Sequence, residues 1–218
     1  MSLDTRTSTP VAAAKGVLFI VSAPSGAGKT TLVNALLEHE PNLLVCVSHT
    51  TREKRPNERD GVNYHFVDTR TFKRMIAENA FVEHAEVFGN LYGTAMSAVT
   101  RDLAAGRSVV LEIDWQGAAQ IRQVFPQAVS IFILPPSLAT LRARLQRRGQ
   151  DDAAVIEARL AAARGEMAHW DEFDYLVVND EFDAALREMR AITRGGPGRS
   201  VCPSAGVRAL LDELLATQ

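Results

Sequence analysis

The chain alternates short apolar runs with segments of helical periodicity. The apolar runs, rich in Val, Ile and Leu, are typical of strands buried on both faces, and they lie at 17–21, 43–47, 108–113, 129–134 and 175–178. Helical patterns follow most of them, at 30–38, 115–124, 138–147 and 182–192. Apolar strands separated by helices predict an α/β fold with a doubly wound parallel sheet.

This alternation breaks between residues 48 and 95. Shorter strand-like segments at 63–67, 81–87 and 91–94 surround one helical pattern at 69–79. We therefore expect a small α+β lobe at 48–95, inserted into a core formed by 16–47 and 96–193.

The two ends of the chain differ from the core. Residues 1–15 are small and polar without periodicity, which predicts a disordered leader. Residues 194–206 are rich in Gly, Pro and Ser and indicate a linker, and 207–215 carry leucines at helical spacing. This last helix either packs on the chain's own core, which we favour, or forms a subunit contact. The oligomeric state is left open.

Composition narrows the class of protein. The 218 residues are 46% hydrophobic, enough for one globular core, and the apolar runs are too short to cross a membrane. A net charge of −2 gives no indication of a nucleic-acid or membrane partner. Only Cys46 and Cys202 are present, so no disulfide framework is expected and a cytoplasmic location is favoured.

The stretch "APSGAGKT" at 23–30 fits the phosphate-loop pattern G-x-x-x-x-G-K-[ST], except that Ala23 replaces the first glycine. It lies between a buried strand and an amphipathic helix, where backbone N–H groups and the helix dipole attract phosphate. Lys29 would reach the terminal phosphates and Thr30 would coordinate Mg²⁺. The expected ATP-binding residues here are Ser25, Gly26, Ala27, Gly28, Lys29, Thr30 and Thr31. The alternative is an ordinary glycine-rich turn.

The segment 48–66 offers candidates for an acceptor site. Arg52, Arg55 and Tyr64 supply two guanidinium groups and a phenol, which suit a phosphate monoester. A solvated, charge-rich loop explains their composition equally well. Glu83 lies in a strand-like pattern, where a single glutamate usually faces solvent.

Together these motifs resemble the guanylate kinase family, bacterial-type nucleoside monophosphate kinases of the phosphate-loop NTPase superfamily. The resemblance covers about residues 16–193 and includes "GNLYGT", "LEIDWQG", "PPS" and "VVND". Its acceptor signature consists of Ser48, Thr50, Thr51, Arg52, Arg55, Glu58, Gly61, Tyr64 and Phe66. The resemblance implies transfer of the γ-phosphoryl group of ATP to GMP, with Mg²⁺, and a helical lid at about 148–165.

The resemblance also implies roles for individual residues. The GMP phosphate would be bound by Arg52, Arg55, Tyr64 and Tyr92, and guanine would be read by Ser48, Glu83 and Thr94 with help from Asp114. The chemistry is consistent: a carboxylate can accept from both N1–H and the 2-amino group of guanine, whereas adenine would present the N1 lone pair.

Acids and arginines complete the implied site. Glu112 and Asp114 are two apart on a predicted strand and so share a side. They either mark the strand end or, as the resemblance implies, assist GMP and Mg²⁺, with Thr30 and Asp114 as metal ligands. Arg144, Arg148 and Arg159 match lid arginines, and the alternative is a solvated basic face. Asn179 would lie near the donor adenine. The implied catalytic residues are Lys29, Arg52, Arg148 and Arg159.

Two other functions remain possible from the sequence. A non-catalytic binding module would not need the intact Lys29 and Thr30, and a kinase of another nucleotide would not need Glu83 and Thr94.

Overall fold

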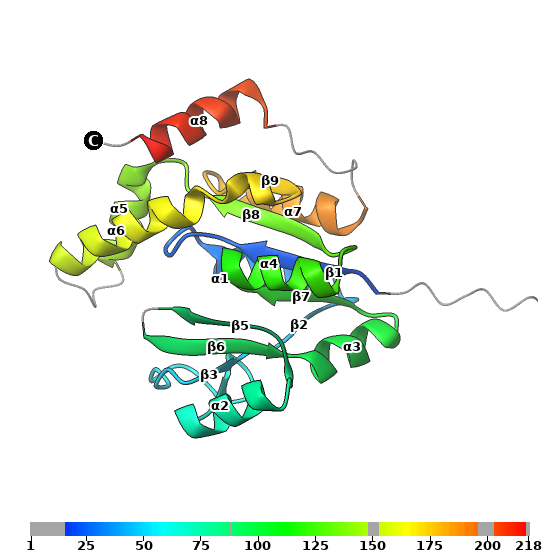
Figure 1. The fold of residues 1–218 in the computed structure, drawn as a ribbon. Helices are drawn as coiled ribbons and strands as arrows, with labels where there is room; N and C mark the ends of the chain where they lie inside the picture. The colour runs from blue at the N-terminus through cyan, green and yellow to red at the C-terminus, as the bar shows by residue number, and fades with distance from the viewer. Residues whose placement is uncertain (1–15, 88, 148–152, 196–202, 217–218) are drawn as a thin grey trace, which may run out of the picture.

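A computed structural model describes residues 16–87, 89–147, 153–195 and 203–216 (Figure 1). The elements, in chain order, are β1 (Leu18–Ser22), α1 (Lys29–His39), β2 (Leu43–Val45), β3 (His49–Thr50), β4 (His65–Phe66), α2 (Thr69–Ala77), β5 (Phe81–Val87), β6 (Asn90–Ala95), α3 (Met96–Ala104), β7 (Ser108–Glu112), α4 (Trp115–Val124), β8 (Val129–Leu134), α5 (Leu138–Arg147), α6 (Ala153–Met167), the 3₁₀ turn η1 (Trp170–Glu172), β9 (Tyr175–Val178), α7 (Phe182–Thr193) and α8 (Ala205–Leu215).

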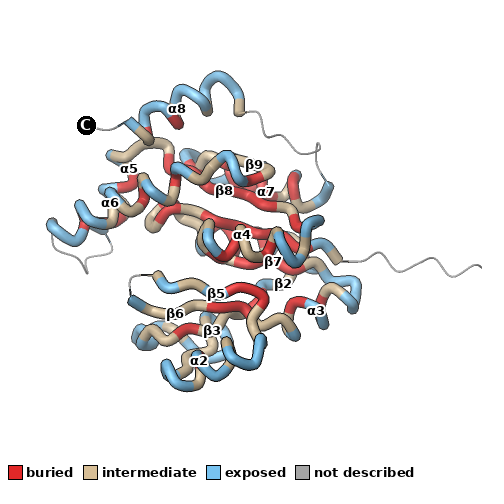
Figure 2. Tube along the Cα trace, in the orientation of Figure 1, coloured by how far each residue is buried: buried red, intermediate tan, exposed pale blue. Residues whose placement is uncertain are grey.

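The core is a five-stranded parallel sheet in the order β2-β7-β1-β8-β9. Leu18 and Ile20 of β1 belong to an apolar cluster with α3, α4 and α8, whereas Phe19 and Val21 belong to a cluster with α1 and α7. Alternate residues of a strand thus face helices on opposite sides of the sheet, which confirms the doubly wound fold. Figure 2 shows buried residues along the central strands β7 and β8 and exposed outer faces on the helices.

The lobe is a four-stranded sheet in the order β4-β3-β6-β5, carrying α2. It lies beside the central sheet in Figure 1 and confirms the expected α+β insertion. Helix α2 ends at Ala77 rather than at the predicted 79 because Asn79 adopts the left-handed conformation, with φ 52°. The two-residue strand β3 was not predicted because so short a segment has no detectable periodicity.

One predicted strand is shorter in the structure, and one helix was not predicted. The strand predicted at 43–47 ends at Val45: the N–H of Cys46 still donates to Val110 O at 3.1 Å, but the chain then turns into the lobe. Helix α3 was not predicted, because its nine residues bury only Val99 and Asp102 and give a weak apolar pattern.

Helices α5 and α6 form a pair, and α8 lies across the end of α6 (Figure 1). Leu211 and Leu214 of α8 are buried in the cluster that contains Met167 and Phe173, so α8 packs on the chain's own core, as favoured from the sequence. It begins at Ala205, two residues before the prediction, because the Ser204 hydroxyl caps it by accepting the N–H of Val207.

The expected leader at 1–15 and the middle of the expected linker lie outside the described residues. Within the part of the chain that is described, no helix combines the length and apolar character needed to span a bilayer.

Candidate active site

The phosphate loop joins β1 to α1. Gly26 and Gly28 have φ values of 95° and 96°, a conformation that suits glycine and turns the loop into the first turn of α1. Lys29 lies at the mouth of this loop, with Nζ 3.4 Å from the carbonyl oxygen of Ile113, beyond the end of β7. The hydroxyl of Thr30 donates to Glu112 Oε2 at 2.9 Å. The carboxyl ends of β1 and β7 therefore enclose the cationic end of the loop.

Two residues predicted for ATP binding brace the other side of the loop. The carbonyl oxygen of Ala27 accepts from Asn179 Nδ2 at 2.7 Å and from Arg144 Nη1 at 3.3 Å, and Arg144 Nη2 donates to Asn179 O at 2.9 Å. A Cβ at Gly28 would collide with the Asn179 amide. These contacts fix the shape of the phosphate loop. The expected position of Asn179 near the adenine of ATP stays a prediction.

Glu166, on α6, is a site residue that the sequence did not indicate. Its Oε2 accepts from the N–H of Ser25 at 3.2 Å, and burial raises the pKa of its carboxyl above the ordinary value. Arg159 lies two helical turns earlier, on the same face of α6. Both residues line a cavity of about 300 Å³ over the phosphate loop, the central hollow. Glu166 follows Arg159 by seven residues, which places both on one face of a helix, and this spacing could have indicated Glu166 from the sequence.

The predicted phosphate-binding residues of the lobe line a cavity of about 560 Å³, the acceptor hollow. Glu58 organises its arginines, since Oε1 accepts from Arg52 Nη2 at 2.7 Å and Oε2 accepts from the N–H of Arg55 at 2.8 Å. The Arg52 guanidinium lies 5.6 Å from the centre of the Tyr64 ring. Burial raises the pKa of Tyr64 to about 12, so its hydroxyl stays a donor at neutral pH.

Three of the residues predicted to read guanine form a connected set, in which Glu83 and Thr94 are buried and Ser48 is half-buried. Glu83 is 3% exposed, and its Oε1 accepts from Thr94 Oγ1 at 2.5 Å. Thr94 Oγ1 lies 3.0 Å from Ser48 Oγ, and because it donates to Glu83 it accepts from Ser48. Burial raises the pKa of Glu83 to about 7, although the Thr94 hydrogen bond opposes that rise. The strand pattern alone would leave Glu83 facing solvent, whereas the family resemblance implies that it reads guanine, and the structure buries it.

Asp114 departs from the sequence expectation. Strand β7 ends at Glu112, and Asp114 instead caps α4, with Oδ1 accepting the N–H of Gly117 at 2.8 Å. Glu112 and Asp114 nevertheless both line the central hollow. The oxygen donors of Thr30, Glu112 and Asp114 are the kind that Mg²⁺ prefers, so this donor set fits the ion. Among the described residues, no cluster of three or more His, Cys, Asp or Glu side chains could hold a metal by itself.

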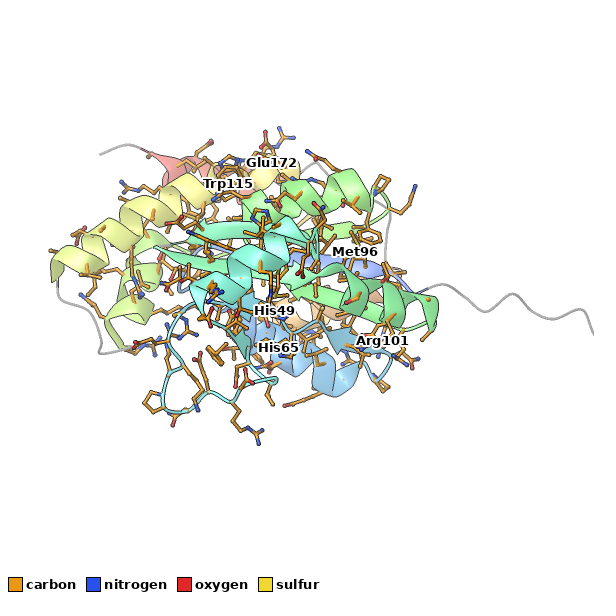
Figure 3. The ribbon with its side chains drawn as sticks, turned by 60° about the horizontal axis from the view of Figure 1, so that its bottom comes forward. His49, His65, Met96, Arg101, Trp115 and Glu172 are labelled. Atoms are coloured by element: carbon orange, nitrogen blue, oxygen red, sulfur yellow. The ribbon has the colours of Figure 1, made fainter. Side chains whose placement is uncertain are left out.

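An aromatic contact holds the first turn of α4. Trp115, directly after Asp114, stacks on His169 with ring centres 3.5 Å apart and planes 7° apart. His169 Nδ1 lies 2.6 Å from Glu172 Oε1, and Figure 3 shows Trp115 and Glu172 close together. The segment after α6 is thereby tied to the helix that Asp114 caps.

The fold brings the two halves of the predicted site together. The central hollow, of about 300 Å³, is lined by the phosphate loop and by Glu83. It shares Ser48, Arg55 and Arg159 with the acceptor hollow. Nearly all the predicted site residues that the structure describes line one of these two hollows. The four exceptions hold lining residues or the phosphate loop in place through hydrogen bonds, and they are Ala27, Thr94, Arg144 and Asn179. Arg148 lies outside the described residues.

Comparisons with known proteins agree with this geometry. The family model described as guanylate kinase matches residues 15–194. The chain is 58% identical over 182 residues to a guanylate kinase of Thiobacillus denitrificans, covering 84% of this chain and 87% of that protein. It is 54% identical over 202 residues to one of Chromohalobacter salexigens, covering 93% and 94%. The crystal structure of guanylate kinase from Anaplasma phagocytophilum superposes with a TM-score of 0.70 at 36% identity, covering 91% of this chain and 95% of that one. The chain therefore belongs to the guanylate kinase family.

Proposed function

We propose that this chain transfers the γ-phosphoryl group of ATP to GMP, with ADP and GDP as products. The observation that carries the proposal is the central hollow, where the phosphate loop faces the hydrogen-bonded set of Glu83, Thr94 and Ser48. Membership of the guanylate kinase family supports the same reaction. Because the reaction consumes ATP and GMP, we also infer a cytoplasmic location.

On the donor side, the loop N–H groups and the N-terminus of α1 would bind the phosphates of ATP. Lys29, next to the end of β7, would stay close to the γ-phosphoryl group as its negative charge redistributes. Arg159 projects from α6 into both hollows and would add a second positive charge there. Arg148 would join it, a role carried only by the resemblance.

On the acceptor side, Arg52 and Arg55, held by Glu58, would bind the phosphate of GMP with the phenols of Tyr64 and Tyr92. The attacking oxygen belongs to a phosphate that is already ionised, so the reaction needs no strong general base. The protein would accelerate transfer by aligning the two nucleotides and stabilising charge.

Mg²⁺ would be held by the Thr30 hydroxyl, by Asp114 and by phosphate oxygens of the nucleotide, with Glu112 close to that hydroxyl. When bound, the ion neutralises charge on the donor phosphates and orients them. Thr30 could keep its bond to Glu112, since the hydroxyl donates its proton to the carboxylate and would face the ion with an oxygen lone pair.

The base would be selected by Glu83. In its ionised form it can accept from N1–H and from the 2-amino group of guanine, and the hydroxyl chain of Thr94 and Ser48 holds it in place. Adenine would present a lone pair to this carboxylate and leave it unpaired. A buried site that hydrogen-bonds one base rejects the other for this reason.

Closure of the lobe and of α5 and α6 over the hollows would exclude water, which could otherwise accept the phosphoryl group. The contact between Glu166 and the loop lies near the end of α6, so that end would stay attached while Arg159 approached the phosphates.

The test is an ADP-release assay with ATP and each of GMP, AMP, CMP and dTMP, with Lys29→Met as the inactive control. We expect GMP to be the preferred acceptor by at least ~10²-fold in kcat/KM. A preference for another acceptor would indicate a different nucleotide kinase. Binding of GMP without turnover by the folded wild-type protein would indicate a binding module.

A further inference from the structure

Strand β5, which carries Glu83, is an edge strand of the lobe sheet. It pairs with β6 on one side only, with Glu83 opposite Thr94 and His84 opposite Gly93. In an antiparallel pair the backbone groups of successive residues point alternately toward the partner and away from it. An edge strand therefore presents a row of outward N–H and C=O groups, which leaves it poorly fixed unless another element binds them.

Helix α4 binds this edge through one side chain. Gln120 Oε1 accepts from the N–H of His84 at 3.0 Å, and Gln120 Nε2 donates to the carbonyl oxygen of His84 at 2.8 Å. A single carboxamide thus satisfies both outward groups of the residue that follows Glu83, as a neighbouring strand would. The two bonds cross from the core to the lobe, because α4 packs on β1 and β5 belongs to the lobe sheet.

The same helix also limits the position of the Glu83 side chain. A Cβ at Gly117 would lie 2.8 Å from Glu83 Oε2, so this carboxylate rests directly against the α4 backbone. Val82, on the other side of Glu83, is buried in the apolar cluster that contains Ala118 and Ile121 of α4. Glu83 is thus flanked by one residue packed on α4 and by another hydrogen-bonded to it.

We propose that Gln120 is a positioning residue for guanine recognition: its two bonds to the His84 backbone set the position of β5, and so direct the Glu83 carboxylate at the N1–H and 2-amino edge of the base. This inference rests on the proposed function, since it takes Glu83 as the group that reads guanine. Gln120 does not touch the nucleotide in this proposal and acts only through the strand.

The proposal predicts a loss of specificity in addition to any loss of stability. Without the Gln120 bonds, β5 is held at this point only by β6 and by packing, and a small displacement of Glu83 weakens one of its two bonds to guanine. IMP lacks the 2-amino group and so depends less on the placement of both carboxylate oxygens. A displaced Glu83 therefore reduces the use of GMP more than the use of IMP.

The experiment compares wild type, Gln120→Met, Gln120→Glu, Glu83→Gln and the control Gln123→Met, an exposed position on the same helix. Gln120→Met keeps length and loses both bonds, whereas Gln120→Glu keeps an acceptor for the His84 N–H. We measure kcat/KM for GMP and for IMP, the Kd for ATP and the thermal midpoint. For Gln120→Met we expect about a tenfold loss with GMP, about a threefold loss with IMP and an ATP Kd within about twofold of wild type.

Gln120→Glu loses the bond to the His84 carbonyl oxygen, which its second carboxylate oxygen would repel, so it should also reduce the ratio of GMP to IMP use, and Gln123→Met should leave the ratio unchanged. Equal losses for GMP and IMP in Gln120→Met would make Gln120 merely structural and overturn the proposal. If Gln120→Met does not fold, Gln120→Glu provides the test, and an unchanged ratio of GMP to IMP use in Gln120→Glu overturns the proposal. If Glu83→Gln alters the ratio and neither Gln120 variant does, only this inference fails. If Glu83→Gln leaves the ratio unchanged, the proposed role of Glu83 fails as well.

Discussion

Replacing Glu83 with Gln is expected to stabilise the ligand-free protein above neutral pH while removing its ability to read guanine. Only 3% of Glu83 is exposed, and among the described residues no positively charged group forms an ion pair with it, although the charge of Lys29 lowers its pKa by less than burial raises it. A buried carboxylate without a cationic partner disfavours the folded state whenever it is ionised. Gln is close to Glu in shape, is neutral at every pH, and can still accept from Thr94.

The magnitude follows from the pKa of Glu83, which burial raises from an ordinary 4.5 to about 7, with Asp114 adding to the rise and Thr94 opposing it. The folded state therefore holds the proton more tightly than the unfolded chain does. The stability that this group contributes is fully present below pH 4.5 and is lost as the pH rises through 7. The loss amounts to roughly 3 kcal/mol in the free energy of unfolding.

The assay is urea denaturation of wild type and Glu83→Gln at pH 5 and at pH 8, without nucleotide. The difference in free energy of unfolding between the two proteins should shift in favour of the variant by roughly 2–3 kcal/mol between these pH values, or about 5–10 °C in thermal midpoint. At the same time, kcat/KM for GMP should fall ~10- to 10³-fold, because Gln presents a donor to a donor.

Glu86→Gln is the matched control, since Glu86 lies on the same strand and is exposed. It should give the same small difference from wild type at both pH values. A stability difference for Glu83→Gln that did not change with pH, or a variant less stable than wild type at pH 8, would refute the view of Glu83 as a desolvated acid.

Other predictions concern the loop, the acceptor arginines, the lid and α8. Lys29→Met should lower kcat by at least ~10²-fold in a folded protein, measured by ADP release, because its charge stabilises the γ-phosphoryl group in transfer. Arg52→Ala should weaken GMP binding by about 1.5–3 kcal/mol and leave the ATP Kd nearly unchanged by calorimetry; loss of ATP binding instead would contradict the division of the site. Amide exchange in the lobe and in α6 should slow only when both nucleotides or a bisubstrate analogue are bound. Leu214→Ala should reduce the free energy of unfolding by about 2–5 kcal/mol in urea denaturation, because Leu214 fixes α8 to the core.

Much of the fold could be predicted from the sequence because its signals are local. The strands at 129–134 and 175–178 and the helices at 115–124 and 138–147 lie where apolar periodicity places them. The phosphate loop could be recognised for the same reason, since its glycines, Lys29 and Thr30 are contiguous and act through their own backbone. Strand β3 and helix α3 were missed because each is too short or too weakly apolar to show a period.

The acceptor half of the site is less local. Arg52 and Arg55 could be selected as phosphate ligands from residue type, but their arrangement depends on Glu58, which binds both. Asp114 was expected on a strand, and the start of α4 instead makes it a cap. Glu166 and Gln120 were not selected from the sequence, because their partners are backbone groups of distant segments, and only the spacing of Glu166 from Arg159 could have indicated either residue.

Most of the secondary structure, the parallel core, the donor loop and, through the order of the motifs, the family followed from the sequence alone. The family motifs selected Glu83 as a guanine-reading residue, but its burial and its raised pKa depend on the packing of β6 and α4 around it. Periodicity reports which side of an element is apolar, but it does not report which distant element removes water from a given side chain. The pKa of a carboxyl depends on that removal of water and on the donors nearby, so its chemistry belongs to the fold.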